Sequence, residues 1–406
     1  MRLRRILLYA PGAVGALLGL ASLAYVYYRA DGPPPNDADM VIVRRQVRDE
    51  DNGYVALHLA EGEIQGLRED WERLDPFPGP WTDGAWDQTV ARKILEENDP
   101  VLMRFDAAAI LPEFCAPALA KPPYSEFAQL LDLCGIRTRF QFMGGKETEA
   151  FDSCLKLLTF TARLECAQDG ILHIIGIRDR RRVVDLLVHL LEKSQVESGL
   201  LQPIFGRLDA LRPVKSAWAD YVRGTYQESS EEAARLSEGH SDEFFGNNAL
   251  VGWLFTQPNE TRRLLLVHCR FMAEDRWKLR GTSSISIGLN YREYTKNCYG
   301  EFIAGNVRKV LEFMFEKVCN ADFSISAAQV LFALKRYKSW HGDLPATLQD
   351  LVPEFLPKVP PDPYDLKPIR YSKEMKRLYA IDRDAVDSGG SDDTTEKQQR
   401  TFRIGF

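Results

Sequence analysis

Apolar residues recur at alternating spacings of three and four along much of this chain, which is the pattern of amphipathic helices. The first long example follows Asp51 and Asn52, two good N-cap residues, and predicts one helix over residues 52–74. Shorter runs predict helices near 87–97, 99–110 and 124–135. The apolar positions of the first stripe are Tyr54, Leu57, Ala60, Ile64, Leu67, Trp71 and Leu74.

The helical pattern is strongest between residues 147 and 223. The stretches "ILHIIGI" and "VVDLLVHLLEK" are apolar nearly all round, so their helix is expected at the centre of a set of antiparallel helices. The cationic run Arg178–Arg182 lies between these two stretches, and we interpret it as a solvated helix face. The acidic stretch 227–243 predicts a mobile loop, whereas 258–272 and 305–319 predict further helices.

The pattern changes after Ser324. A helix is expected over 325–341, followed by a segment with prolines at 345, 353, 357, 360, 361, 363 and 368. Strands are expected to end at Tyr371, to cover 377–381 and to form the C-terminal "TFRIGF". Residues 323–406 therefore predict a small α+β module of their own.

The N-terminal segment predicts a membrane anchor. Three arginines precede 23 uncharged residues, Ile6–Tyr28, which is long enough for a transmembrane helix. The arginines place the N terminus in the cytoplasm and the bulk of the chain in the periplasm, as in a single-pass inner-membrane protein. A cleaved signal peptide, with Ser22 and Ala24 before the cut, is the alternative.

These patterns predict a mainly α fold in four parts: a transmembrane anchor (1–29), a linker (30–50), a multi-helix antiparallel domain (51–322) and the C-terminal α+β module (323–406). With 45% hydrophobic and 27% charged residues, the composition is that of an ordinary globular protein. The net charge of -6 argues against a nucleic-acid partner, which would require a basic face. None of the seven cysteines forms a CxxC pair, so the sequence offers neither a zinc knuckle nor a redox motif.

The stretch from Leu331 to Tyr371 resembles the soluble module of the major pseudopilins of type II secretion. The residues that carry the resemblance are Tyr337, His341, Gly342, Leu344, Pro345, Leu348, Leu351, Asp362, Pro363, Tyr364, Pro368 and Tyr371. The family has glycine where Asp365 stands, and aspartate tolerates the left-handed conformation expected there. The whole layout resembles single-anchor bacterial envelope proteins that end in such a module, and this resemblance implies no activity.

The resemblance implies a calcium site in the loop after the second strand. Four aspartates surround Gly389 and Gly390 and offer the hard oxygen ligands that calcium prefers. The alternative interpretation is a solvated acidic turn. The predicted ligands are Asp384, Asp387, Asp392 and Asp393.

No catalytic residue can be named from the sequence. Ser153 and Lys156 match Ser-x-x-Lys, but the companion motifs of penicillin-recognising enzymes are absent from the chain. Two function classes remain. The favoured one is a membrane-anchored, non-catalytic scaffold of the cell envelope, related to secretion and binding a protein partner; the alternative is an envelope hydrolase whose acid pair is assembled only in space.

Overall fold

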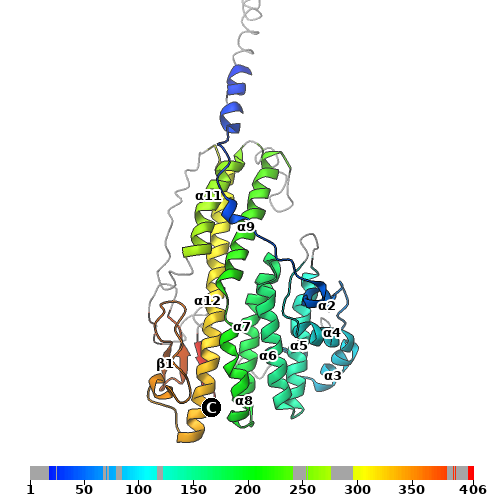
Figure 1. The fold of residues 1–406 in the computed structure, drawn as a ribbon, viewed down its shortest axis with the longest axis vertical. Helices are drawn as coiled ribbons and strands as arrows, with labels where there is room; N and C mark the ends of the chain where they lie inside the picture. Colours follow the sequence, from blue (N-terminus) through cyan, green and yellow to red (C-terminus); the bar gives the residue numbers. More distant parts are fainter. Residues whose placement is uncertain are drawn as a thin grey trace, which may run out of the picture. The chain divides into compact units, whose positions relative to one another are not determined.

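The computed structural model describes residues 18–23, 25–66, 70, 73–78, 85–116, 122–240, 253, 255–275, 296–381, 387, 389 and 401–406. This part of the chain is mainly helical, with one small antiparallel sheet (Figure 1). It forms two compact units. The described residues of the larger unit are within 43–221 and 313–406, and those of the smaller unit within 18–42, 222–275 and 296–312.

Within the described residues, every helix is too short or too polar to cross a membrane. Residues 18–23 and 25–29 are helical, whereas residues 6–17 and 24 of the predicted span lie outside the described part. The predicted transmembrane helix, the single-pass topology and the inner-membrane localisation are therefore wrong.

The larger unit is built around the long helix α7 (Gly170–Lys193). This helix has buried residues on most of its sides, and it packs against both α5 (Tyr124–Met143) and α6 (Glu147–Glu165) (Figure 1). The other helices and short 3-10 turns of this part of the chain are η2 (Asp49–Asp51), α2 (Gly53–Leu57), α3 (Gln88–Glu97), α4 (Asp99–Ala109), α8 (Ser198–Gly206) and η4 (Leu208–Leu211).

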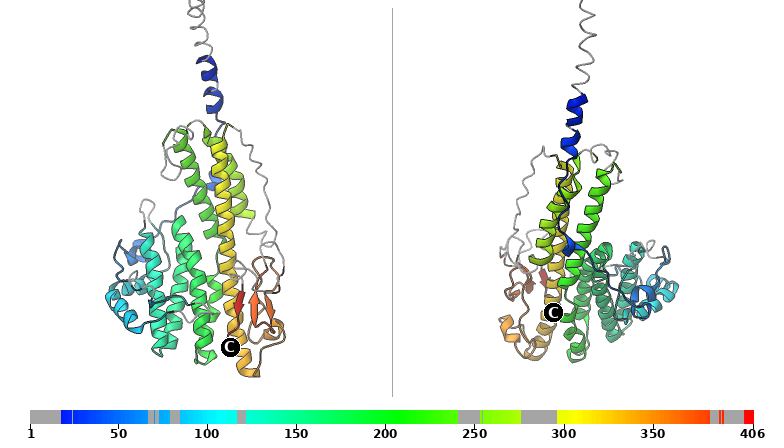
Figure 2. Two further views of the ribbon diagram at one scale, coloured as in Figure 1. Left: turned by 180° about the vertical axis from the view of Figure 1, so that it is seen from behind. Right: turned by 45° about the horizontal axis from the view of Figure 1, so that its top comes forward.

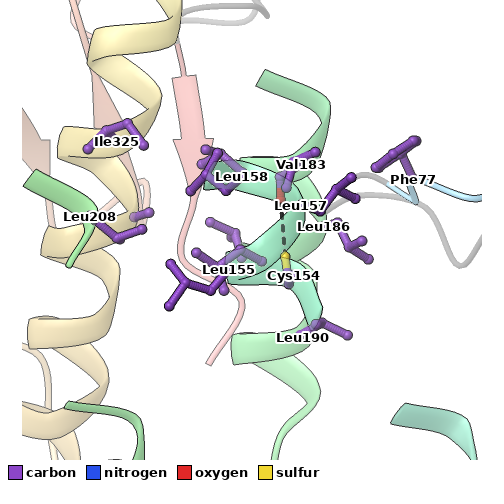
Figure 3. Close-up of a cluster of buried hydrophobic side chains, with 14 of the residues drawn as sticks. Phe77, Cys154, Leu155, Leu157, Leu158, Val183, Leu186, Leu190, Leu208 and Ile325 are labelled. Atoms are coloured by element: carbon purple, nitrogen blue, oxygen red, sulfur yellow. Dashed lines mark hydrogen bonds between the residues drawn. The ribbon is translucent and has the colours of Figure 1, made fainter. Parts of the chain in front are cut away.

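Leucine side chains fill the interface between α6 and α7 (Figure 3). The Cys154 thiol donates to the Val183 carbonyl oxygen across this interface at 3.6 Å. The helices approach closely at Gly176, because a Cβ there would lie 2.7 Å from the Thr161 carbonyl oxygen and 2.9 Å from the Glu165 amide nitrogen. Cys154 thus behaves as a small buried apolar side chain.

The helix predicted over residues 52–74 is wrong beyond its first turn. Asn52 does cap α2, since its side chain accepts from the Tyr54 amide at 3.1 Å. The helix ends at His58, which is left-handed with φ 41° and ψ 52°, and Gly62 and Gly66 also have positive φ. A backbone that leaves the right-handed region three times cannot continue one helix.

The C-terminal residues fold against a single long helix, α12 (Cys298–His341), which replaces two predicted helices and passes through the predicted boundary at 322/323 without a break. Three antiparallel strands, β1 (Arg370–Ser372), β2 (Arg377–Tyr379) and β3 (Thr401–Arg403), form a sheet in the order β1-β2-β3. The 3-10 turn η6 (Leu348–Leu351) precedes them. Both views in Figure 2 show this sheet beside the C-terminal half of α12.

One hydrophobic core runs through the larger unit. It extends from Leu57 in α2 to Ile404 after β3 and includes residues from every long helix of the unit. Phe402 of β3 is fully buried, and its ring lies 5.9 Å from that of Phe323 in α12. Leu348, Leu351 and Phe355 of the proline segment are buried as well, and the Phe355 ring lies 5.5 Å from that of Tyr337 in α12.

The smaller unit contains η1 (Ala38–Met40), α11 (Pro258–Arg270), the π-helical turn η5 (Phe271–Asp275) and part of α9 (Lys215–Ser237) and α12. The segment 30–42, predicted as a free linker, is bound along α11. Asp31 caps this helix by accepting from the Asn259 amide at 2.8 Å, and Asp37 pairs with Arg262 at 2.6 Å. Residues 227–237, predicted as part of a loop, are helical in α9.

Candidate functional site

Three of the four predicted calcium ligands, Asp384, Asp392 and Asp393, lie outside the described residues. The fourth, Asp387, is half-exposed; one of its oxygens accepts from the Gly389 amide at 2.9 Å, and the other lies 3.4 Å from Arg370 Nε. Among described residues, no group of three histidine, cysteine, aspartate or glutamate side chains is placed to hold a metal. The calcium site stays a prediction.

Arg370 stands at the centre of a cluster of aspartates in the C-terminal part. Its Nη1 lies 2.6 Å from Asp362 Oδ2, and its Nη2 lies 2.5 Å from Asp365 Oδ2. Asp362 is fully buried and accepts two backbone N–H groups as well, from Tyr364 at 2.8 Å and Ile381 at 2.9 Å. The carboxylates are therefore tied to one guanidinium and to the surrounding backbone.

A tight turn brings Asp362 and Asp365 to Arg370. The Asp362 amide donates to the Lys367 carbonyl at 2.6 Å, and the left-handed residue is Leu366, with φ 61°, rather than Asp365 as expected. Burial raises the pKa of Asp362. At Asp365 burial also acts to raise the pKa, but hydrogen bonds from Arg370 and the Lys367 amide outweigh it, and the pKa is lowered.

The run Arg178–Arg182 is not the solvated helix face that we predicted. Asp179 and Arg180 are almost completely buried, since α7 is covered by its neighbours on most sides. Each arginine of the run pairs with a carboxylate. We name this set the charged belt; its pairs are Arg178–Asp179 (2.5 Å), Arg180–Glu165 (2.5 Å), Arg181–Asp185 (3.0 Å), Arg182–Asp132 (2.9 Å) and Arg182–Asp179 (2.8 Å).

The charged belt connects α7 to its neighbours on three sides. Asp132 is on α5 and Glu165 on α6, while Arg181 reaches α12 by donating to Ser324 Oγ at 3.0 Å. Burial raises the pKa of Asp132 to about 6 and also raises the pKa of Glu165, in both cases against the opposing effect of the paired arginine. Arg182 bonds Asp132 and Asp179 at once, and Arg178 also bonds Asp179, so both carboxylates are held in ion pairs.

The other motifs from the sequence do not converge on a site. Ser153 is buried, whereas Lys156 is half-exposed with its Nζ 3.7 Å from Asp106. His173 is buried; its Nδ1 donates to the Glu165 carbonyl oxygen at 2.9 Å, and burial lowers its pKa to about 4. Ser153 and His173 are therefore core residues, whereas Lys156 lies at the surface.

An exposed aromatic surface lies at the C-terminal end of α12, and sequence reasoning did not identify it. Trp340 is 66% exposed, and its ring meets that of the buried Phe355 edge-on at 5.8 Å. Tyr337 and His341 stack at 4.1 Å beside it, and the Arg336 guanidinium lies 5.5 Å from the Phe355 ring centre. We call these five side chains the tip surface.

A sequence signal for the tip surface existed. Tyr337 and His341 belong to the apolar face predicted for residues 325–341, whereas Trp340 lies off that face. A tryptophan outside the buried stripe of a helix is expected to be exposed, because the opposite side of the helix faces solvent.

No family model matches the chain, and no curated protein or solved structure matches it either. The resemblance of the C-terminal part to pseudopilins therefore stays a prediction.

Proposed function

We propose that this chain is a non-catalytic interaction protein that binds a protein partner through the tip surface. The observation that carries the proposal is the exposure of Trp340, at 66%, on a cluster whose other members are held in place. Tryptophan, tyrosine and arginine are the residue types most often responsible for binding energy at protein interfaces. Three of the five side chains of the tip surface are of these types.

The geometry favours binding with little loss of conformational freedom. Phe355 is buried and supports the Trp340 ring from one side, and Arg336 is fixed by donating to Gln202 Oε1 at 2.6 Å. Covering the exposed part of a tryptophan would contribute about 3 kcal/mol at the usual coefficient for apolar area. The flanking cations Arg336 and Lys338 suit a partner that places a carboxylate beside an apolar side chain.

The charged belt supports a binding function rather than hydrolysis. A hydrolase needs a carboxylate that is free to exchange a proton with substrate. Asp179 is fully buried and bonded to two arginines, and Asp132 is bonded to Arg182. This pair contributes to helix packing instead.

Site-specific photocrosslinking tests the proposal. A photoreactive phenylalanine replaces the exposed Ser339 beside Trp340, and the matched control replaces Met143, which is 59% exposed at the end of α5. We expect a discrete crosslinked protein from position 339 that is absent from position 143. The partner, once purified, should bind Trp340→Ala at least about tenfold more weakly than Met143→Ala. Equal binding of the two variants would contradict the proposal.

A further inference from the structure

We infer that the guanidinium of Arg370, and not a bound calcium ion, is the cation around which the described aspartates of the C-terminal part gather. The three aspartates around it come from two places in the chain. Asp362 and Asp365 lie in one tight turn, Asp387 follows β2, and Arg370 itself begins β1. One side chain thereby holds together the parts that a bound metal would otherwise join.

The described carboxylates do not fit a calcium ion. Calcium takes six to eight oxygen ligands at about 2.3–2.6 Å. Both Asp362 oxygens are taken up by N–H donors: Oδ1 accepts from the Tyr364 amide, and Oδ2 accepts from the Ile381 amide and from Arg370 Nη1. Of Asp387, one oxygen accepts from Gly389 and the other faces Arg370. A divalent cation at these oxygens would lie next to a fixed positive charge and be repelled by it.

The guanidinium suits this position for a geometric reason. It is planar and carries five N–H donors that point outward in fixed directions, so it can bond several carboxylates at once, and it keeps its charge at every relevant pH. A lysine ammonium carries the charge without the planar fork. The bond from the Ile381 amide to Asp362 then links this cluster to the end of β2. The sheet is thus held by a cation that is part of the chain.

Thermal unfolding of the full chain tests the inference. The wild type should melt at the same temperature in 2 mM calcium chloride and in chelator. Arg370→Met should melt lower by more than about 5 °C in both buffers, because it leaves buried Asp362 without its cation. Lys373→Met is the matched control: it removes a cation from the neighbouring position 373, where the pair with Asp343 at 2.8 Å is exposed, and it should change the Tm little.

Arg370→Lys keeps the inference testable if Arg370→Met does not fold. Lysine retains the positive charge but not the planar set of N–H donors, so the Tm of Arg370→Lys should lie between those of the wild type and Arg370→Met. If Arg370→Met does not fold, the Tm of Arg370→Lys should still lie below that of the wild type. The inference is overturned if calcium raises the Tm of the wild type. It is also overturned if both Arg370 variants melt where the wild type does.

Discussion

Glu165 and Arg180 face each other from α6 and α7 with side chains that are only 2% and 1% exposed. Removing one member of such a pair leaves a buried charge without a partner, which costs about 3–5 kcal/mol. Arg180→Met should therefore be strongly destabilising. The double variant Glu165→Gln/Arg180→Met should lose less stability than Arg180→Met alone, because no charge is then left behind. Urea unfolding followed by circular dichroism measures both.

Arg48→Met is the control for this pair, since Arg48 meets Glu50 on the surface with both side chains more than two-thirds exposed. Exposed pairs contribute about 0–1 kcal/mol, so this variant should unfold close to the wild type. Glu165→Gln alone completes the comparison. If the stability lost by the double variant equals the sum of the losses of Glu165→Gln and Arg180→Met, the two side chains do not act as a pair.

His268 is a second residue whose burial has a measurable consequence. It is 4% exposed on α11, and burial, assisted by the charge of Arg308, lowers its pKa to about 4. The unfolded chain, with an ordinary histidine pKa of about 6.5, binds more protons than the folded chain between these values. Folded stability therefore falls as the pH falls through this window, by up to about 3 kcal/mol from this group.

His268→Leu removes that contribution. Its stability relative to the wild type should increase steadily from pH 7 to pH 4.5 in denaturant titrations. If the stability difference between His268→Leu and the wild type is the same at every pH, the pKa of His268 is not lowered by folding.

At the scale of elements, the contact between α6 and α7 depends on Gly176. Alanine has the higher helix propensity, by about 1 kcal/mol, so on propensity alone Gly176→Ala would stabilise α7. Here the added Cβ would lie within 2.9 Å of the α6 backbone, which must then move. We expect a net loss of about 1–3 kcal/mol, the usual cost of overpacking a core.

Gly170→Ala tests the same substitution at the start of the same helix, where the nearest atom to an added Cβ is the Tyr221 ring at 4.0 Å. Its melting temperature should equal or exceed that of the wild type. If both glycine variants shift the melting temperature in the same direction, the close approach at Gly176 does not limit packing.

The sequence predicted helices well where an apolar stripe is long, and less well where charge is the main signal. Residues 227–237 are acidic, but Ala233 and Leu236 are buried, and this burial together with good helix formers continues α9. Asn320 and Ser324, between the two helices predicted near 305–341, bond each other within α12 at 2.7 Å instead of interrupting it. The left-handed turn at His58 has no such local signal.

The candidate site was predictable only in part. The aspartates of the C-terminal loop were visible as residue types, but Arg370 was not, because no sequence spacing places a strand residue against Asp362 and Asp387. The charged belt was not predicted for a related reason. A run of arginines is normally solvated, and the burial of Arg180 and partial burial of Arg182 are possible only because the fold places Glu165 and Asp132 beside them.

At the scale of the whole larger unit, the C-terminal residues share their core with the helices before them. Phe332 of α12 stacks on Phe205 of α8 at 4.1 Å, and Lys335 donates to the Ser194 carbonyl at 2.9 Å. A fragment of residues 323–406 would expose these surfaces, and its strands are only three residues long. We expect the fragment alone to be unfolded, with narrow amide dispersion in proton–nitrogen correlation spectra.

In the same correlation spectra, the full chain should give dispersed amide signals for residues 323–406. A fragment with a dispersed spectrum and a cooperative melt would show that the C-terminal residues fold independently, as the division at 322/323 implies.

The contacts of the segment 30–42 also set an order of events during synthesis. Asp37 and Asp39 leave the ribosome early, but their partners Arg262 and Arg270 follow 225 and 231 residues later. Helices α5, α6 and α7 are consecutive, and their mutual contacts can form while the chain is still growing. The residues of this segment are thus made early but are among the last to reach their places. Until then the carboxylates of Asp31, Asp37 and Asp39 remain available to other molecules that contact the nascent chain.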